Sequence, residues 1–540
     1  MVRTGGVPRG LVAGALSAAL LFAAFPPLEW PALAWVALVP ILLYSLEAPP
    51  RAAALSGFFA GALYWLATLA WLTRVSWAGW MALSLYCALY SAAFTLGVAA
   101  WAGPRAGRPG WGSRLALAPA LAAGWVGWEY LRSVLLTGFP WNALGVSQFT
   151  NTPVIQLAEL GGVPLVSGLV ALVNAAVALV LFRWMKRGAV RGAAPSVEPL
   201  MAALAVALAL GYGRWAVRRL PPEPDALRVA AVQVNVPQAE KWSESWTAEI
   251  NRRVRAASLE AVARDRFDLL IWPETVVPDF VRTSRISRRL VDDVLESGVP
   301  LLLGAMDFEA GDGRTRYYNS AFLFEPGGGE PQVYAKQHLV LFGEYVPFSK
   351  WLPWLRALTP FEENFSPGSG PVVFRLPGGG PPESAGAPRT VGVLICFEDT
   401  VARLARAAVR AGARLLINQT NDAWFDPSWA SRQHLAQSLF RCVETRVGLV
   451  RATNTGVTCR IDRLGRIRER LPAASGGVPI PEVLPATAGL APPGDISTLY
   501  GRLGDWVGWG SALAALALLA AGWRDGRRRS GLDRPGWARL

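Results

Sequence analysis

Eight apolar stretches dominate the sequence, and each approaches the roughly 20 residues that a helix needs to cross the hydrocarbon core of a membrane. They cover residues 9–25, 28–46, 52–73, 78–101, 114–134, 162–184, 198–217 and 505–523. In lipid, such segments satisfy their backbone N–H and C=O groups by forming helices. The pattern therefore predicts a polytopic α-helical membrane domain of seven transmembrane helices over residues 1–220. An eighth transmembrane helix is expected at 503–524.

The first stretch has a second interpretation. Arg3 and Arg9 precede an Ala/Leu-rich core, as in a secretory signal peptide. We favour a membrane span, because no clear cleavage site follows and further spans come directly after it.

The composition agrees with a membrane chain. Hydrophobic residues make up 52% and charged residues only 17%, against about 25% in ordinary globular proteins. The net charge of +14 could indicate nucleic-acid binding, but the arginines cluster in short patches beside apolar runs, so no nucleic-acid partner is expected. Four cysteines without CxxC spacing and only two histidines argue against a zinc site. We expect no metal and no cofactor.

The basic residues predict the orientation of the spans. Lys and Arg gather at the N-terminus, in every second loop and after the last span, whereas the intervening loops hold almost none except Arg74. The clustered residues are Arg3, Arg9, Arg51, Arg105, Arg108, Arg114, Arg183, Lys186, Arg187, Arg191, Arg524, Arg527, Arg528 and Arg529. Because cytoplasmic loops carry an excess of Lys and Arg, both termini should be cytoplasmic, including a basic tail at 525–540. The segment between spans seven and eight should then lie outside the cytoplasm.

That segment has the pattern of an α/β domain over residues 226–492. Short apolar runs of strand length alternate with amphipathic, helix-like stretches, which is typical of buried strands connected by helices. The expected strands are Leu227–Val234, Leu269–Trp272, Pro300–Ala305, Val391–Cys396 and Leu415–Asn418. The expected helices are 245–264, 284–296, 400–412 and 431–446. Residues 472–492 have the composition of a linker that returns to the membrane.

Three polar residues follow strand-like runs. Glu274 comes after Leu269–Pro273, Lys336 after Gln332–Tyr334, and Cys396 at the end of Val391–Ile395. A cysteine at a strand-to-helix turn gains from the helix N-terminus, which favours the thiolate and aligns backbone N–H donors for an oxyanion. A nearby carboxylate can take the thiol proton, and a lysine can stabilise the charge that develops at an attacked carbonyl.

Each of these residues also has an ordinary structural interpretation. A single cysteine after an apolar strand is most often a small core residue, and the glutamate and lysine fit a loop and a solvated surface. Cys442 falls on an Arg/Glu-rich helix pattern and Cys459 in a strand-like run. We expect both to be structural and unpaired, although an oxidising compartment leaves a disulfide open. The combination of Glu274, Lys336 and Cys396 is more informative than any one of them.

The set Trp272-Pro273-Glu274, Lys336 and Cys396-Phe397-Glu398 resembles the Glu-Lys-Cys triad of the nitrilase superfamily. Eight spans with such a domain between the seventh and eighth resemble the apolipoprotein N-acyltransferase family, which completes bacterial lipoprotein maturation. The segments Val232–Gln238 with Lys241-Trp242, Leu341–Pro347, Thr420–Phe425 and Asn454–Val457 also resemble that family. The resemblance covers nearly the whole chain and implies a nitrilase-like αββα sandwich beside the membrane domain.

The resemblance also implies roles for individual residues. Cys396 would be the nucleophile, Glu274 the general base and Lys336 the stabiliser of the tetrahedral intermediate. The implied reaction is ping-pong. Cys396 takes an acyl chain from a membrane phospholipid as a thioester. The N-terminal amine of an S-diacylglyceryl-cysteine in an apolipoprotein then accepts that chain as an amide.

Four further residues match functional positions of the family. Glu344 would support the triad, and Glu398 and Trp242 would contribute to the site, although simple packing is an equal alternative for Trp242. Phe397 stands where some relatives have tyrosine, which removes a hydroxyl but keeps the backbone N–H.

The resemblance implies a multi-pass protein of the bacterial inner membrane, with its catalytic domain on the periplasmic side. The self-contained membrane anchor favours a monomer. Two alternatives remain at this point. A membrane-tethered amidase or hydrolase of the nitrilase family would use the same triad and let water take the thioester. A transporter or scaffold whose outer domain has lost activity is the non-enzymatic alternative, and the intact triad argues against it.

Overall fold

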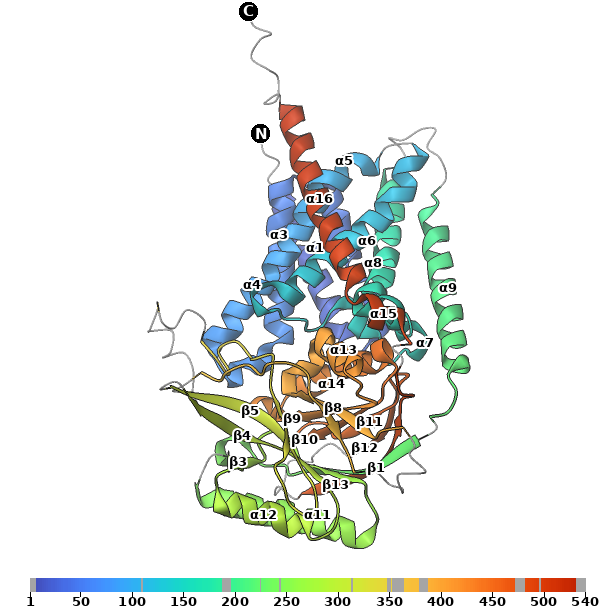
Figure 1. The fold of residues 1–540 in the computed structure, drawn as a ribbon. Helices are drawn as coiled ribbons and strands as arrows, with labels where there is room; N and C mark the ends of the chain where they lie inside the picture. The colour runs from blue at the N-terminus through green and yellow to red at the C-terminus, as the bar shows by residue number, and fades with distance from the viewer. Residues whose placement is uncertain are drawn as a thin grey trace, which may run out of the picture. The chain divides into compact units, whose positions relative to one another are not determined.

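The computed structural model describes residues 6–107, 110–186, 196–223, 225–241, 244–311, 314–346, 351, 364–377, 387–471, 481–494 and 497–530. The chain divides into two compact units, one formed by Met1–Arg218 with Asp505–Leu540 and the other by Arg219–Gly504. Figure 1 shows that the first unit is helical and that the second contains the strands. The predicted fold class, apolar helices with an α/β domain, is confirmed.

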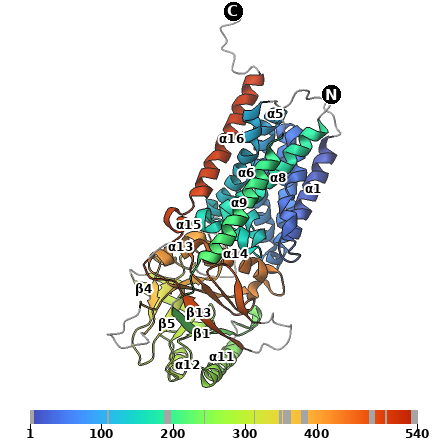
Figure 2. The same cartoon turned by 90° about the vertical axis from the view of Figure 1, so that its right-hand side faces the viewer.

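The helical unit places a helix on each predicted apolar stretch, and Figure 2 shows several of these helices side by side. They are α1 (Gly6–Ala24), α2 (Val39–Glu47), α3 (Pro50–Thr68), α4 (Trp77–Gly97), α6 (Trp111–Val134), α8 (Ala158–Met185), α9 (Glu198–Arg219) and α16 (Trp506–Ser530). Within the described ranges, four helices combine the length and hydropathy of a membrane span: Trp77–Ala106, Ala158–Met185, Glu198–Arg219 and Trp506–Arg528.

The second predicted span is not one continuous helix. A 3₁₀-helix, η1 (Pro31–Trp35), precedes α2, and Val36 adopts a non-helical backbone between them. Pro40 lies in the first turn of α2, where its missing N–H leaves no hydrogen bond unmade. The proline therefore starts a new helix in the middle of an apolar stretch that looks uniform in the sequence.

Small residues allow the helices of this unit to pack closely. On α6, a Cβ added at Gly127 would lie 2.2 Å from the Ser511 backbone oxygen and 2.7 Å from Ala515 Cβ, both on α16. On α3, Gly57 and Gly61 make similar approaches to α4. Contacts of this kind are typical of helix association in lipid, where van der Waals packing replaces the hydrophobic effect.

Replacing Gly127 with alanine is expected to destabilise the protein by about 1–3 kcal/mol, the usual cost of overpacking a tight interface. The matched control is Gly97→Ala on α4, because a Cβ there meets nothing within 4 Å. Thermal unfolding in detergent should show a lower Tm for Gly127→Ala and an unchanged or raised Tm for Gly97→Ala. Equal Tm values for the two variants would contradict the close α6–α16 contact.

Two sheets form the centre of the second unit. The first has the order β13-β1-β2-β4-β5-β6, with β3 also paired to β4, and the second has the order β12-β11-β10-β9-β8-β7. The strands of the first sheet are β1 (Asp225–Gln233), β2 (Leu269–Ile271), β3 (Val277–Phe280), β4 (Leu301–Gly311), β5 (Arg314–Phe324), β6 (Gln332–Ala335) and β13 (Glu482–Leu490). Those of the second are β7 (Val373–Arg375), β8 (Thr390–Ile395), β9 (Leu415–Thr420), β10 (Leu449–Thr453), β11 (Cys459–Ile461) and β12 (Ile467–Arg470). Pairing is parallel among β1, β2 and β4 and among β8, β9 and β10.

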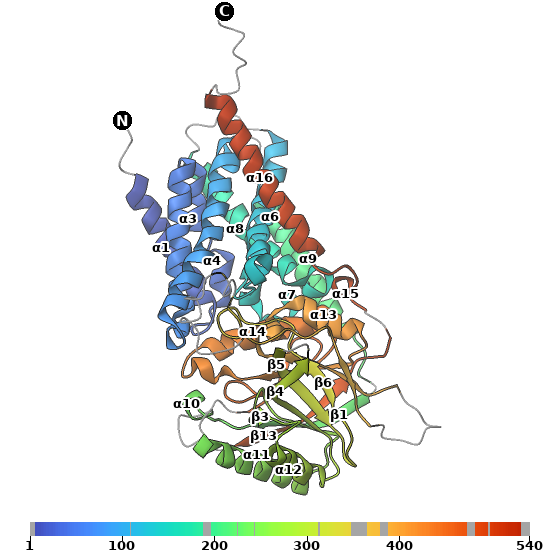
Figure 3. The same ribbon diagram turned by 60° about the vertical axis from the view of Figure 1, so that its left-hand side comes forward.

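The two sheets pack face to face with helices on their outer faces, which makes an αββα sandwich (Figure 3). Leu227, Val229 and Ala231 of β1 point into the apolar core between the sheets. Ala230 and Val232 point the opposite way, toward α11 (Glu244–Arg264) and α12 (Arg285–Leu295). On the outer face of the second sheet lie α13 (Ala402–Arg410) and α14 (Ala430–Thr445). Because both faces of each sheet are covered, the central parallel strands are buried along most of their length, and β2, β8, β9 and β10 are buried at every residue.

One sequence assignment was wrong. Within the stretch 472–492, which we expected to be a linker, Glu482–Leu490 forms β13 and pairs antiparallel with the whole of β1. Its inward residues Leu484, Ala486, Ala488 and Leu490 belong to the core between the sheets. The sequence signal was weak because Pro485, Thr487 and Gly489 alternate with them on an edge strand, where proline is tolerated.

Candidate active site

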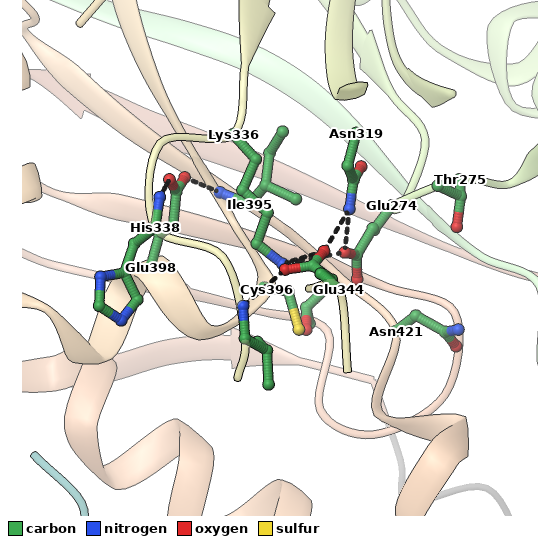
Figure 4. A network of polar contacts seen from close by, with 12 residues as sticks. Glu274, Thr275, Asn319, Lys336, His338, Glu344, Ile395, Cys396, Glu398 and Asn421 are labelled. Atoms are coloured by element: carbon green, nitrogen blue, oxygen red, sulfur yellow. Dashed lines mark hydrogen bonds and ion pairs between the residues drawn. The ribbon is translucent and has the colours of Figure 1, made fainter. Parts of the chain in front are cut away.

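The polar residues singled out in the sequence lie where strands end. Glu274 follows β2, Lys336 follows β6 and Cys396 follows β8. Ligands in sheets with parallel strands commonly bind beyond these carboxyl ends. In Figure 4, the side chains of Glu274, Lys336 and Glu344 converge, with the Cys396 sulfur beside them.

Lys336 links the two carboxylates of the site. Its Nζ lies 2.8 Å from Glu344 Oε1 and 3.7 Å from Glu274 Oε1, and the side chain is buried. Burial alone would lower the pKa of Lys336, but Glu344, Glu274 and Cys396 together raise it above its ordinary value. Lys336 is therefore a fixed ammonium at neutral pH and is suited to stabilise an anion rather than to exchange a proton.

Cys396 has a strained backbone, with φ at +52° in the left-handed region. Non-glycine residues in this region cost about 1–3 kcal/mol and persist where the surrounding structure holds them, often at active sites. Here Asn418 of β9 donates to the Cys396 carbonyl at 3.1 Å and to the Leu394 carbonyl at 3.1 Å. The conformation turns the chain from β8 into the 3₁₀-helix η8 (Cys396–Thr400).

The expectation that a helix N-terminus favours the Cys396 thiolate is not met. Burial, reinforced by Glu274, raises the pKa of the Cys396 thiol above its ordinary value, and Lys336 offsets only part of this. The element that follows is a five-residue 3₁₀-helix, whose dipole is small compared with that of a long α-helix. The resting thiol is therefore protonated, and a neighbouring base is needed to activate it.

Glu344 and Glu398 both lie near Lys336, but Glu344 binds the Lys336 ammonium whereas Glu398 binds backbone N–H groups. Glu344 Oε2 accepts from the Val340 N–H at 2.9 Å while Oε1 binds Lys336. Glu398 is fully buried and accepts four hydrogen bonds, from Tyr334 Oη and from the backbone N–H groups of Gln337, His338 and Ile395. Glu398 therefore fastens the segment after Lys336 to the strand before Cys396.

Phe397 and Trp242 complete the set of predicted residues. The Phe397 ring stacks on His338 with ring centroids 5.8 Å apart. Phe397 therefore packs beside one of the residues that Glu398 binds. Trp242 lies outside the residues that the structure describes.

Within the described part of the chain, no group of three His, Cys, Asp or Glu side chains is placed to hold a metal ion. Cys442 and Cys459, expected to be structural, are buried and free.

Sequence reasoning missed Asn319. This residue of β5 donates from Nδ2 to Glu274 Oε1 at 2.8 Å and to Glu344 Oε1 at 3.2 Å. Its backbone carbonyl also accepts from the Lys336 N–H at 2.8 Å. The available signal was the polar pair Asn319-Ser320 at the start of the buried run Ala321–Phe324.

Replacing Asn319 with alanine is expected to lower turnover by about ten- to a hundredfold, because both carboxylates lose a buried donor and Glu274 is less well positioned. The neighbouring Ser320→Ala is the control, since the buried Ser320 hydroxyl makes no hydrogen bond among the described residues. Steady-state assays should show lower turnover for Asn319→Ala than for Ser320→Ala, while the Tm values of the two variants stay similar. Equal turnover of the two variants would mean that Asn319 does not contribute to the reaction.

A second buried network lies behind Cys396. His434 is bound by two carboxylates, Asp422 Oδ1 at 2.9 Å from Nδ1 and Asp399 Oδ1 at 2.7 Å from Nε2. Arg451 contacts the same carboxylates, and its Nη1 donates to Ser438 Oγ at 2.6 Å. Burial lowers the pKa of His434, but the attraction of Asp399 and Asp422 outweighs this and raises it to about 9. Two cations thus neutralise two anions in the interior.

Two family models match the chain. The model described as the apolipoprotein N-acyltransferase N-terminal domain matches residues 17–176, and the carbon-nitrogen hydrolase model matches residues 228–492. An amidase of the nitrilase superfamily from Nesterenkonia, a solved structure, aligns with 50% of this chain and 93% of its own at 17% identity and a TM-score of 0.35.

Curated relatives cover nearly the full length. An apolipoprotein N-acyltransferase of Geobacter metallireducens is 37% identical over 95% of this chain and 95% of its own. That of Azotobacter vinelandii is 35% identical over 91% of this chain and 90% of its own. That of Gloeobacter violaceus is 33% identical over 96% of both chains.

Proposed function

Because this chain belongs to the apolipoprotein N-acyltransferase family, we propose that it acylates lipoprotein precursors through a thioester on Cys396. The donor is a membrane phospholipid, and the acceptor is the N-terminal amine of an S-diacylglyceryl-cysteine. The observation that carries this proposal is the meeting of Glu274, Lys336 and Cys396 at the carboxyl ends of three strands.

In the first half-reaction, Glu274 takes the thiol proton and the Cys396 sulfur attacks the ester carbonyl of the phospholipid. The raised pKa of the Cys396 thiol supports a general base in this step. Lys336, held as an ammonium by Glu344 and Glu274, stabilises the tetrahedral oxyanion. Collapse of the intermediate expels the lysophospholipid, which receives the proton from Glu274.

In the second half-reaction, the free amine of the lipoprotein precursor attacks the thioester and Glu274 accepts its proton. An amide replaces the thioester, and Cys396 leaves as the thiol after Glu274 returns the proton to its sulfur. Because a thioester is a more reactive acyl donor than an amide, the transfer needs no external energy source. No metal and no cofactor is needed for either half-reaction.

The protein acts as a multi-pass monomer of the bacterial inner membrane, with eight spans, cytoplasmic termini and a periplasmic catalytic unit. Within the helical unit, α1 begins and α16 ends at the same end of the bundle, as Figure 1 shows. Charged pairs such as Arg105–Asp525 at 2.6 Å lie on the short α5 (Gly103–Ala106) and on the last turns of α16. Basic residues at this end support its placement on the cytoplasmic side.

The proposal is tested by product analysis with a phosphatidylethanolamine donor and a synthetic diacylglyceryl-cysteine peptide. An increase in peptide mass by one acyl chain, stable to hydroxylamine, together with release of a lysophospholipid, is the expected result. A Cys396→Ala variant should form neither product. Release of free fatty acid without peptide acylation would instead identify a membrane-tethered hydrolase.

A further inference from the structure

A second buried lysine lies beside the site. Lys241 ends the single-turn helix α10 (Gln238–Lys241), and only 2% of its side chain is exposed. Its Nζ donates to the backbone carbonyl of Glu274 at 3.1 Å and to Thr275 Oγ1 at 2.9 Å. An ammonium group is costly to bury unless negative charge lies near it. Glu274 supplies this negative charge, and Cys396 adds to it when it is deprotonated.

The charges around the nucleophile do not balance without Lys241. Glu274 and Glu344 contribute two carboxylates, and Lys336, which contacts both, contributes one ammonium. This group alone carries one excess negative charge, and deprotonation of Cys396 or formation of an oxyanion adds another. The charge of Lys241 brings the resting group to neutrality.

The position of Lys241 is fixed by contacts with the ends of other strands. Gln238 Oε1, on the same helix, accepts from Asn421 Nδ2 at 2.9 Å. Asn421 in turn accepts from Asn454 Nδ2 at 2.8 Å, and Asn454 Oδ1 accepts from the Val236 N–H at 3.0 Å. The segment that leads into α10 is therefore tied to the loops that follow β9 and β10.

The segment that Lys241 binds is itself strained. Thr275 has φ at +42°, in a region that residues branched at Cβ seldom adopt. A Cβ at Gly304 of β4 would lie 2.7 Å from the Glu274 Cα, so the backbone also packs tightly against β4. The hydrogen bonds from Lys241 hold this turn and, with it, the direction of the Glu274 carboxylate.

We propose that Lys241 is a positioning residue for the acyl transfer: it holds the Glu274–Thr275 turn and offsets the negative charge that develops when Cys396 attacks the phospholipid ester. This inference rests on the proposed function. A neutral side chain could bind the same carbonyl and hydroxyl, but it would leave the excess negative charge in place. The two parts of the role can therefore be separated by experiment.

The electrostatic part has a pH signature. Burial lowers the pKa of Lys241 to about 8, although Glu274 and Cys396 oppose this shift. Its charge is thus present below that pH and is lost as the pH rises through it. Among the described residues, the other charged groups of the site are Lys336, which contacts Glu274, Glu344, which binds Lys336, and Glu240 on α10 itself. Thioester formation should accordingly decline above about pH 8.

The test measures single-turnover thioester formation on the full-length protein from phosphatidylethanolamine in mixed micelles, across pH. Lys241→Gln should be slower than the wild type by about ten- to a hundredfold at neutral pH, the effect of one nearby charge in a protein interior. It should also lack the decline at higher pH. Thr275→Val removes one hydrogen-bond acceptor of Lys241 but leaves the Lys241 charge in place. Its rate of thioester formation should therefore still decline above about pH 8. Lys241→Arg, whose guanidinium stays charged, should move the decline to higher pH.

A Lys241→Gln variant as fast as the wild type would overturn the inference, and so would a slow variant that keeps the alkaline decline. A wild-type profile without that decline would overturn it even if Lys241→Gln failed to fold. Absence of any thioester in the wild type would instead refute the proposed function. The two failures are therefore distinguishable.

Discussion

Replacing Glu274 with glutamine is expected to slow thioester formation on Cys396 by about 10³-fold at neutral pH, within the usual range for loss of a general base. The amide keeps the size of the side chain but cannot take the thiol proton. Because burial itself raises the pKa of the Cys396 thiol, little thiolate forms without the base. Up to about pH 8, where Lys241 keeps its charge, the rate of the variant should therefore recover by about tenfold per pH unit as the thiolate fraction grows.

Glu344→Gln is the matched comparison. Glu344 also binds Lys336 and Asn319, but it transfers no proton in the proposed mechanism. Its replacement should cause a smaller loss and leave the slope of the pH–rate profile close to that of the wild type. Rapid-quench measurement of released lysophospholipid would give both profiles. A steep pH–rate profile for Glu344→Gln together with a wild-type slope for Glu274→Gln would mean that Glu344, and not Glu274, is the general base.

Replacing Arg451 with methionine is expected to lower the free energy of unfolding by about 3–5 kcal/mol, the usual result of removing one partner from a buried ion pair. Arg451 is fully buried and contacts both Asp399 and Asp422. Without it, two interior carboxylates share the single charge of His434. Arg460→Met is the control, because the Arg460–Glu469 pair is partly exposed and should contribute at most about 1 kcal/mol. Chemical unfolding in detergent measures the free energy of unfolding of both variants. Similar losses of stability would mean that Arg451 does not stabilise the buried carboxylates.

The same network predicts a pH dependence. The folded pKa of His434 is about 9, above its ordinary value of 6.5, so its stabilising charge is fully present below pH 6.5. That contribution is lost as the pH rises through about 9. The difference in Tm between the wild type and His434→Gln should shrink over this interval. A difference that is constant with pH would mean that His434 is not charged in the folded protein.

The sequence predicted the layers of the catalytic unit well where strands are buried on both faces. Leu269–Trp272 and Leu415–Ile417 are continuously apolar and polar residues follow them closely, so both the strand and the position of a site at its end are visible. Edge strands were harder to find. Of the residues in β13, only alternate ones reach the core, and Pro485 and Gly489 resemble a linker.

The supporting contacts of the site depend on distant parts of the chain. Asn319 and Glu274 are 45 residues apart, and Val236 and Asn454 are 218 apart. A local pattern can mark one polar residue, such as Asn319 before the buried run Ala321–Phe324, but it does not show which distant side chain that residue binds. The raised pKa of Cys396 likewise depends on burial in the assembled unit, which outweighs the local effect of a short helix.

Intact-mass measurement shows directly whether Cys396 carries the acyl chain. After incubation with a defined phosphatidylethanolamine, the wild type should gain the mass of one acyl chain, and hydroxylamine should remove it. Addition of a diacylglyceryl-cysteine peptide with a free amine should discharge the same adduct, and Cys396→Ala should never acquire it. An adduct that persists in Cys396→Ala, or peptide acylation without any adduct in the wild type, would contradict the account.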